Sequence, residues 1–218
     1  MSDSEQRDCT ERKDSELSGA AHDPARDRRL AQRIRDGDIA AFTTIFHLYY
    51  AALVRFVTRH LGSQDAAEDV VQDLFTRLWD VRAGIDPSRS LRAYLFTMAR
   101  NRAVNVLEHD VVVRQHAEEV LGLLPQTATV PAADALVLTD ELARLVAARV
   151  ATLSPRLREI YHLSRDEGLS TSEIAETLGI ATQTVYLQLA KVVRILYETL
   201  EPWVKGEGEA PGPEDRSV

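Results

Sequence analysis

The sequence contains a single cysteine, Cys9, among its 218 residues. One thiol cannot form a disulfide within the chain, so a disulfide framework of the kind found in small secreted domains is excluded. No run of about 18 apolar residues is present, which argues against a membrane-spanning helix. The N-terminus also lacks the apolar core of a signal peptide. We therefore expect a soluble cytoplasmic protein without direct insertion into a membrane.

Catalytic and metal-binding constellations are also missing. The histidines are scattered along the chain, at positions that include His47, His60, His109, His116 and His162. No activated nucleophile and no cluster of histidines with metal-ligand spacing is visible. The sequence thus predicts that the protein is not an enzyme and has no catalytic residue, no metal ligand and no cofactor. A hydrolase that holds a metal with carboxylates remains the enzymatic alternative.

The negative charge of the chain is unevenly distributed. The formal net charge is −8, but residues 1–24 carry −4 and residues 201–218 carry −3, which leaves only −1 for the central part. Within that part, residues 65–80 hold five acids and one arginine, whereas residues 88–108 hold four arginines and one glutamate. Charge segregated in this way indicates more than one kind of partner surface, and the overall acidity does not exclude nucleic acid.

Residues 65–79 carry the clearest helical pattern. Apolar residues recur at the spacing of a half-buried helix, namely Ala67, Val70, Val71, Leu74, Phe75 and Leu78. Asp65, Asp69 and Asp73 stack on the opposite face at four-residue intervals. Like charges stacked this way cost a few tenths of a kcal/mol per pair. Taken alone, the pattern is typical of a solvated acidic face, and a carboxylate metal cage is a further alternative.

The order of the patterns predicts an all-α protein with two small helical domains joined by a flexible linker. The first domain is expected to hold a short helix from Asp27 to Gly37, a helix N-capped by Asp38, the acidic helix after Ser63, a loop at 81–90 and a helix from Leu91 to about Leu107. The expected divisions are a disordered acidic arm (1–24), the first helical domain (25–109), a linker (110–138), a second helical domain (139–200) and a disordered acidic tail (201–218).

The helix expected from Leu91 to about Leu107 has a face rich in amides and arginine. Thr97, Asn101 and Asn105 stack along it, and Arg92, Arg100 and Arg102 flank them. Arginine contacts phosphates, while carboxamides can read base edges. The face therefore indicates nucleic-acid binding, with an ordinary solvated helix surface as the alternative.

Residues 168–186 have the spacing of a helix-turn-helix, which is the feature that defines the second domain. Ser170 and Glu173 form a capping box, and Gly179 supplies the left-handed turn. The second helix is expected to bury Val185, Leu189, Val192, Val193 and Leu196. It leaves Gln183, Thr184, Leu187, Gln188 and Lys191 outward. An earlier helix is expected to use Ser154 as its N-cap and Pro155 as its first residue. The spacing favours a reader of duplex DNA over a purely structural helical hairpin.

Both segments together resemble the sigma factors of bacterial RNA polymerase, in particular the extracytoplasmic-function group, which keeps only regions two and four. The resemblance covers roughly residues 27–108 and 140–200. The segment Ala67-Glu-Asp-Val-Val-Gln-Asp-Leu-Phe is similar to the region-two signature, and Leu91-Arg-Ala-Tyr-Leu-Phe-Thr-Met-Ala-Arg-Asn-Arg-Ala to the promoter-melting helix. Leu153-Ser-Pro-Arg-Leu-Arg-Glu and the stretch from Ser172 to Val185 are similar to region four.

The resemblance implies a role for each surface. The acidic helix would dock on the largest polymerase subunit through Asp65, Glu68, Asp69, Gln72, Asp73 and Arg77. The −10 element of the promoter would be held by Arg92, Asn101, Arg102 and Asn105. The −35 element would be read by Gln183, Thr184, Gln188 and Lys191, with Arg156 and Arg158 on phosphates. The implied partners are core RNA polymerase, promoter DNA and an anti-sigma factor, which in this family is often membrane-bound.

The recognition helix departs from the family pattern in its charge. Ala181 stands where a serine cap is usual, and Lys191 is the one basic residue of the segment 181–191. Fewer phosphate contacts imply a smaller salt-dependent contribution to binding, so we expect weak DNA affinity in the absence of polymerase. The alternative function is a stand-alone helix-turn-helix regulator, which would leave the acidic helix without a role.

Overall fold

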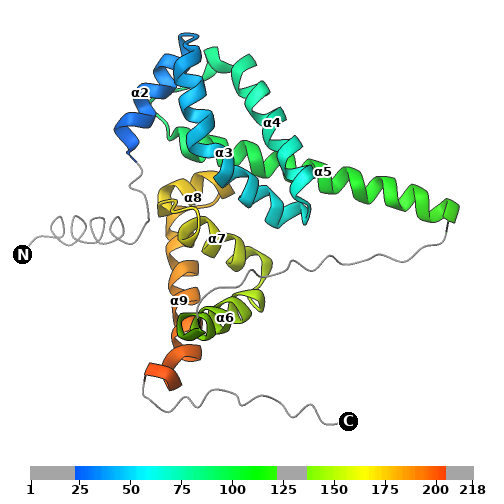
Figure 1. Cartoon of the computed structure of the whole chain (residues 1–218), viewed down its shortest axis with the longest axis vertical. Helices are drawn as coiled ribbons and strands as arrows, with labels where there is room; N and C mark the ends of the chain where they lie inside the picture. Colours follow the sequence, from blue (N-terminus) through cyan, green and yellow to red (C-terminus); the bar gives the residue numbers. More distant parts are fainter. Residues whose placement is uncertain (1–22, 122–136, 205–218) are drawn as a thin grey trace, which may run out of the picture.

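Every regular element in the part of the chain that the structure describes is a helix (Figure 1). The structure is a computed structural model that describes residues 23–121 and 137–204, with side chains for 23–109 and 142–201. The elements are α2 (Pro24–Arg35), α3 (Ile39–Leu61), α4 (Gln64–Asp80), the 3₁₀ turn η1 (Arg82–Gly84), α5 (Leu91–Leu121), α6 (Val137–Ala151), α7 (Pro155–Arg165), α8 (Thr171–Leu178) and α9 (Thr182–Val204). The all-α expectation is confirmed.

Local capping residues decide where the first helices begin. Helix α2 starts three residues earlier than we expected, because Asp23 accepts a hydrogen bond from the Ala25 amide and Pro24 occupies the first turn. Asp38 caps α3 by accepting from the amides of Ala40 and Ala41 at 2.8 and 3.2 Å. Each cap satisfies amides that have no partner within the helix.

Glycine and serine set the junction between α3 and α4. Gly62 ends α3 in the left-handed conformation, with φ of 71°. The hydroxyl of Ser63 then accepts from the Ala66 amide at 3.3 Å and starts α4, as expected. The tight turn makes α3 and α4 antiparallel neighbours, which is how both bury their apolar sides.

The apolar sides of α2 to α5 form the core of the N-terminal domain, by which we mean residues 23–109. Phe56 and Phe96 are fully buried and meet edge-to-face with their ring centres 5.3 Å apart. Helix α3 is long and apolar enough to cross a membrane on length and composition alone. Its apolar residues Ile45, Leu53 and Phe56 are buried in this core.

Helix α5 differs most from the expectation. It has 31 residues and runs to Leu121, well past the end we expected near Leu107. The first part of the segment 110–138, which we assigned to the linker, is therefore helical. The physical reason lies in the sequence, since no glycine or proline interrupts the helix before Gly122. The end of the expected linker, residues 137–138, already belongs to α6. Residues 122–136 of the linker, most of the acidic arm and the end of the acidic tail lie outside the described residues.

The C-terminal domain, α6 to α9, contains the helix-turn-helix. Ser170 and Glu173 form the expected capping box at the start of α8, and Gly179 ends that helix with φ of 63°. Val185 and Val192 are buried, and Leu189 packs against the core that contains Val185. One detail of the expectation is wrong, because Val193 is 65% exposed and lies one position beyond the buried stripe. Ser154 is the N-cap of α7 and Pro155 its first residue, as expected, although the Ser154 side chain makes no capping hydrogen bond.

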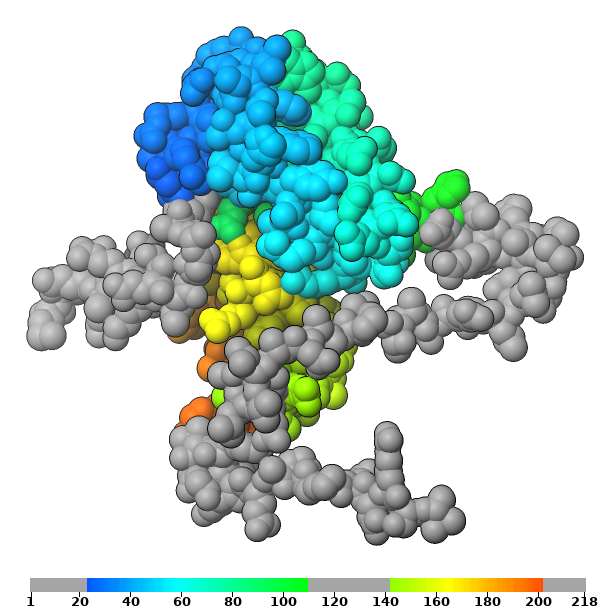
Figure 2. Space-filling model, in the orientation of Figure 1, coloured from blue at the N-terminus to red at the C-terminus, as the bar shows by residue number. Residues whose placement is uncertain are grey.

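The two domains pack directly against each other. Helix α8 lies against α5 beside the end of α3 (Figure 1), and the space-filling view shows the domains in contact (Figure 2). The apolar core is continuous from Phe96 in the N-terminal domain to Leu163 and Ile174 in the C-terminal domain. The two domains are therefore not separated in this structure.

Candidate functional site

The acidic face of α4 consists of Asp65, Glu68, Asp69, Gln72, Asp73 and Arg77. All of these residues are exposed except Glu68, which is half-buried. The opposite side of the helix supplies Val71, Leu74 and Leu78 to the core. The sequence pattern therefore placed both sides of this helix correctly. Three carboxylates in a stack repel one another when no partner is bound, so the face favours a cationic surface.

Part of that repulsion is already relieved within the chain. The Gln64 amide donates to the Glu68 carboxylate at 2.9 Å. The guanidinium of Arg102 on α5 donates to the carboxylate of Asp73. The carboxylates of Asp65 and Asp69 are exposed to solvent.

The predicted −10 residues on α5 separate into two groups. Asn101, Arg102 and Asn105 are exposed, and Arg102 contacts Asp73 of α4. Arg92 is half-buried, and its guanidinium donates to the backbone carbonyls of Glu167 and Gly168 in the other domain. The structure thus brings Asn101, Arg102 and Asn105 together on an open face but not Arg92.

The loop before α5 is held by a short side-chain turn. Asp86 accepts from the hydroxyl of Ser88 at 2.7 Å and from its amide at 2.9 Å. These two hydrogen bonds lower the pKa of Asp86. An aspartate that bonds to the residue two positions on is a common device for fixing a loop. Ile85 anchors the same loop in the core.

The predicted −35 residues of α9 lie at the surface of the C-terminal domain or are half-buried there. Gln183, Thr184 and Lys191 on α9 are exposed, and Gln188 is half-buried. Leu187 lies on the same outward side and is 58% exposed. A leucine there supplies apolar surface of the kind that contacts a thymine methyl group.

The two arginines predicted to contact phosphates are engaged inside the C-terminal domain. Arg156 donates to the Leu178 carbonyl and to the Glu159 carboxylate, both at 3.2 Å. Arg158 donates to the carbonyls of Leu153 and Ala151. Their guanidinium groups therefore tie the start of α7 to its neighbours in this structure.

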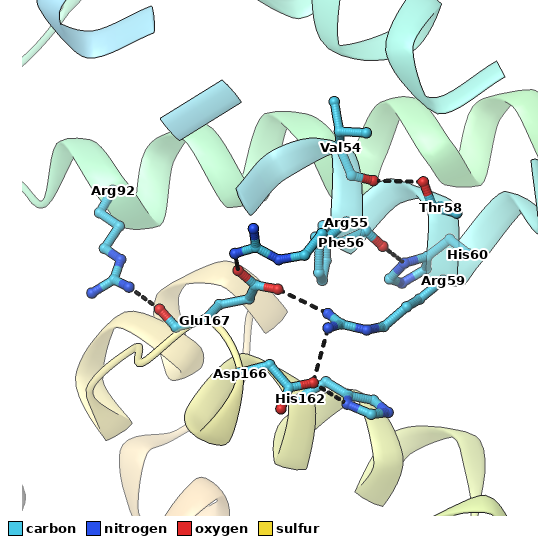
Figure 3. A network of polar contacts seen from close by, with 10 residues as sticks. All are labelled: Val54, Arg55, Phe56, Thr58, Arg59, His60, Arg92, His162, Asp166 and Glu167. Atoms are coloured by element: carbon cyan, nitrogen blue, oxygen red, sulfur yellow. Dashed lines mark hydrogen bonds and ion pairs between the residues drawn. The ribbon is translucent and has the colours of Figure 1, made fainter. Parts of the chain in front are cut away.

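The residues at the domain boundary were missed by sequence reasoning. The side chain of Glu167 is 0% exposed and accepts from Arg55 at 3.1 Å and from Arg59 at 2.9 Å (Figure 3). Arg59 also donates to Asp166 at 2.9 Å, and that carboxylate bonds His162 at 2.7 Å (Figure 3). The separation of 112 residues between Arg55 and Glu167 explains the omission, because no local period links them.

A half-buried carboxylate, Glu159, lies at the same boundary. Glu159 pairs with Arg100 at 2.8 Å and with His60 at 3.5 Å. Burial raises the pKa of Glu159, but its hydrogen bonds to His60 and Arg100 outweigh burial and lower the pKa to about 2. Farther out, Ser90 donates to Glu173 at 2.8 Å, and Arg89 pairs with Glu176.

The ion pairs across this boundary all have the same polarity among the described residues. The arginines come from the N-terminal domain (Arg55, Arg59, Arg89 and Arg100), as does His60, which contacts Glu159. The carboxylates come from the C-terminal domain (Glu159, Asp166, Glu167 and Glu176). Within the described part of the chain, no group of three or more histidine, cysteine or acidic residues is arranged to hold a metal.

Comparison with known proteins assigns both domains. Residues 45–110 match the family model for Sigma-70 region 2, and residues 143–196 match the model for Sigma-70, region 4. The ECF RNA polymerase sigma factor SigL of Mycobacterium tuberculosis is 34% identical over 166 residues, which are 75% of this chain and 91% of SigL. The ferric citrate uptake sigma factor FecI of Escherichia coli is 28% identical over 152 residues, which are 70% of this chain and 86% of FecI.

Two solved structures have a similar fold. CnrH, in complex with the cytosolic domain of CnrY, is 26% identical with a TM-score of 0.56, over 81% of this chain and 97% of CnrH. The sigma factor RpoE of Bartonella quintana, in complex with the anti-sigma factor NepR, is also 26% identical. Its TM-score is 0.52, over 75% of this chain and 98% of RpoE. The chain belongs to the extracytoplasmic-function group of RNA polymerase sigma factors, which serve in transcription initiation.

Proposed function

We propose that this sigma factor recruits core RNA polymerase through the acidic face of α4 and reads the promoter with α5 and α9. The observation that carries the proposal is the exposed stack of Asp65, Asp69 and Asp73 on a helix whose opposite side is buried in the core. A fold-stabilising role does not need three solvated like charges in line, whereas a cationic partner surface does.

The promoter contacts divide between the domains. Asn101, Arg102 and Asn105 on α5 offer amide and guanidinium groups to the non-template strand of the −10 element, where bases leave the duplex during melting. Gln183, Thr184 and Gln188 on α9 read base edges of the −35 element in the major groove, and Lys191 adds a phosphate contact. The protein assists melting by holding the separated strand and has no catalysis of its own.

The remaining partner is an anti-sigma factor. CnrH and the Bartonella quintana RpoE were each solved in complex with another protein, which in the second case is named an anti-sigma factor. We propose that this chain also binds an anti-sigma factor. We further propose that this chain acts in the cytoplasm, where polymerase and DNA are found.

A paired experiment tests the docking assignment. The double variant Asp69→Lys/Asp73→Lys should lose binding to purified core polymerase and fail to start run-off transcripts from genomic fragments. Asp36→Lys/Glu198→Lys changes the net charge equally at exposed sites away from α4 and should behave like the wild type. Equal polymerase binding by both double variants would refute the assignment. If the wild-type chain bound duplex alone as a dimer and brought down no polymerase, it would instead be a stand-alone regulator.

A further inference from the structure

Helix α2 carries more positive charge than its place in the fold requires. It has five arginines and one aspartate among its 12 residues. Leu30 and Ile34 attach its apolar side to the core, whereas Arg28, Arg29 and Arg33 are exposed. Arg29 and Arg33 stand four residues apart, and like charges at this spacing repel one another. The exposed side of α2 therefore favours an anionic partner.

These arginines border a hollow between α2 and the loop that precedes α5. The hollow has a volume of about 650 Å³ and is lined by Arg28, Arg29, Gln32, Arg33, Pro87 and Ser88. Its walls are largely apolar. Since Pro87 is the one apolar residue of the six, most of the wall consists of the methylene groups of the arginines and Gln32. Long cationic side chains keep their charged ends in water, so the hollow has a cationic rim.

A nucleotide fits this combination better than an acidic protein side chain does. Unpaired bases stack on arginine and on apolar side chains, while their phosphates pair with the cations beside them. A carboxylate would use only the rim and would leave the apolar walls in contact with water. The chemistry of the hollow therefore points to single-stranded nucleic acid.

Arg33 can exchange its present partner for a phosphate. Its guanidinium pairs with the Asp38 carboxylate at 2.7 Å, and the two side chains are 54% and 33% exposed. Exposed ion pairs contribute little to stability. Asp38 also accepts from the amides of Ala40 and Ala41, so its carboxylate keeps hydrogen-bond partners when Arg33 turns away. Arginine can then bind phosphate with two parallel hydrogen bonds.

The hollow continues the proposed −10 surface. Helix α2 contacts both η1 and α5 (Figure 1). The turn between Asp86 and Ser88 fixes the loop that forms one wall of the hollow, and this loop leads directly into α5. Tyr94 is 37% exposed and precedes Asn101 and Asn105 by seven and eleven residues, which places it on their side of the helix. A strand held by the two asparagines can therefore pass Tyr94 and reach the hollow.

We propose that this hollow binds the unpaired nucleotides that adjoin the −10 element on its downstream side. Copying needs an unpaired template, so strand separation extends from the −10 element toward the start site. Arg28, Arg29 and Arg33 hold phosphates of the non-template strand, and one base lies in the hollow against Pro87. The proposal rests on the proposed function for the identity of the strand, and it adds a DNA contact on α2.

Two promoter probes test the proposal with holoenzyme assembled from the full-length chain and core polymerase. Both probes come from a promoter that gives run-off transcripts. Each is duplex upstream of the −10 element and has only the non-template strand through that element. The short probe ends at the last −10 nucleotide, whereas the long probe continues for about six nucleotides, within the range of a single-strand site.

The variant and its control each remove three exposed arginines. The α2 variant is Arg28→Ala/Arg29→Ala/Arg33→Ala. The control is Arg144→Ala/Arg165→Ala/Arg194→Ala, at exposed positions of the C-terminal domain. Circular dichroism of both should match the wild type.

The salt dependence of binding should distinguish the two probes. Each phosphate contact to a single strand changes the slope of log affinity against log salt by about 0.7. On the long probe the α2 variant should therefore lose about two units of slope, which is about 20-fold in affinity between 50 and 200 mM salt. On the short probe its slope should equal that of the wild type. The control should match the wild type on both probes.

Abasic nucleotides test the base contact. Placed one at a time along the extension, an abasic nucleotide should weaken wild-type binding about fivefold or more at the position that enters the hollow. The α2 variant should show no such position.

Each contrary result is distinct. Equal slopes for the wild type and the α2 variant on the long probe overturn the proposal, and a loss of slope without an abasic effect overturns the base contact. Weaker binding of the α2 variant than of the control to core polymerase without DNA would make the surface a polymerase contact instead. A wild-type holoenzyme that binds neither probe and starts no transcript refutes the proposed function, and this proposal falls with it.

Discussion

Arg102 on α5 donates a hydrogen bond to the carboxylate of Asp73 on α4. The first residue belongs to the proposed −10 surface and the second to the proposed polymerase surface. Their contact makes the two surfaces neighbours on one domain. A cationic polymerase residue that takes over Asp73 would release Arg102 for the promoter strand, which is one way for polymerase to raise the DNA affinity of this protein.

Asp73→Asn should weaken polymerase binding with little effect on folding. The side chain of Asp73 is 63% exposed and that of its partner Arg102 is 45% exposed. An exposed ion pair of this kind contributes about 0–1 kcal/mol to stability. We therefore expect nearly the same urea midpoint as the wild type but a higher Kd for core polymerase. Asp36→Asn, at an exposed aspartate that ends α2, is the control. A large loss of stability in Asp73→Asn would show that the pair is structural.

Gln183→Ala and Lys191→Ala should affect promoter recognition in different ways. A glutamine that reads a base contributes about 1–3 kcal/mol of discrimination, so Gln183→Ala should relax preference at one −35 base pair. Lys191→Ala should weaken all promoters about equally and reduce the salt slope by about one. Binding of the polymerase complex to a set of −35 variants measures both effects, with Arg194→Ala as the control. Identical profiles for the two variants would contradict the assignment.

Ser170→Ala should destabilise the C-terminal domain. The Ser170 hydroxyl accepts from the Glu173 amide at 3.3 Å and donates to its carboxylate at 2.9 Å. Loss of such an N-cap costs about 1 kcal/mol of the free energy of unfolding, which urea denaturation can measure. Thr43→Ala removes a hydroxyl that bonds to the Ile39 carbonyl within α3 and should change stability less. Equal effects would mean that the capping box contributes nothing specific.

Glu159 should make stability depend on acid pH. Its pKa falls from 4.5 to about 2 on folding, so the carboxylate stabilises the folded state above pH 4.5 and this contribution is lost as the pH falls toward 2. At about 1.4 kcal/mol per pKa unit the loss is at most on the order of 3 kcal/mol. The free energy of unfolding should fall less steeply in Glu159→Gln than in the wild type or Glu198→Gln over that window. Parallel curves would contradict the assignment.

Patterns among residues close together in the sequence predicted many of the helices and their ends. The apolar stripe and acidic stack of α4, the capping box at Ser170 and the turn at Gly179 each depend on residues within a few positions of one another. They could be read from sequence because helix period and capping are local properties. The length of α5 was underestimated because its apolar pattern weakens after Leu107, whereas helices end only where a breaker or a cap ends them.

The contacts between the domains could not be read in the same way. Arg59 and Glu167 are 108 positions apart, and neither stands in a periodic pattern. A half-exposed arginine on α3 looks like any solvated side chain until the fold places a carboxylate opposite it. The position of Arg92 depends on contacts of the same kind. We expected Arg92 on an open −10 surface, but it donates to the Gly168 carbonyl of the other domain.

The single polarity of the domain boundary also limits self-association. Two N-terminal domains would bring arginines against arginines at this face, and two C-terminal domains would bring carboxylates against carboxylates. A symmetric dimer built from like halves is therefore repulsive here. Any oligomer that uses this face has to exchange halves between chains, so that each cationic half receives the anionic half of its neighbour.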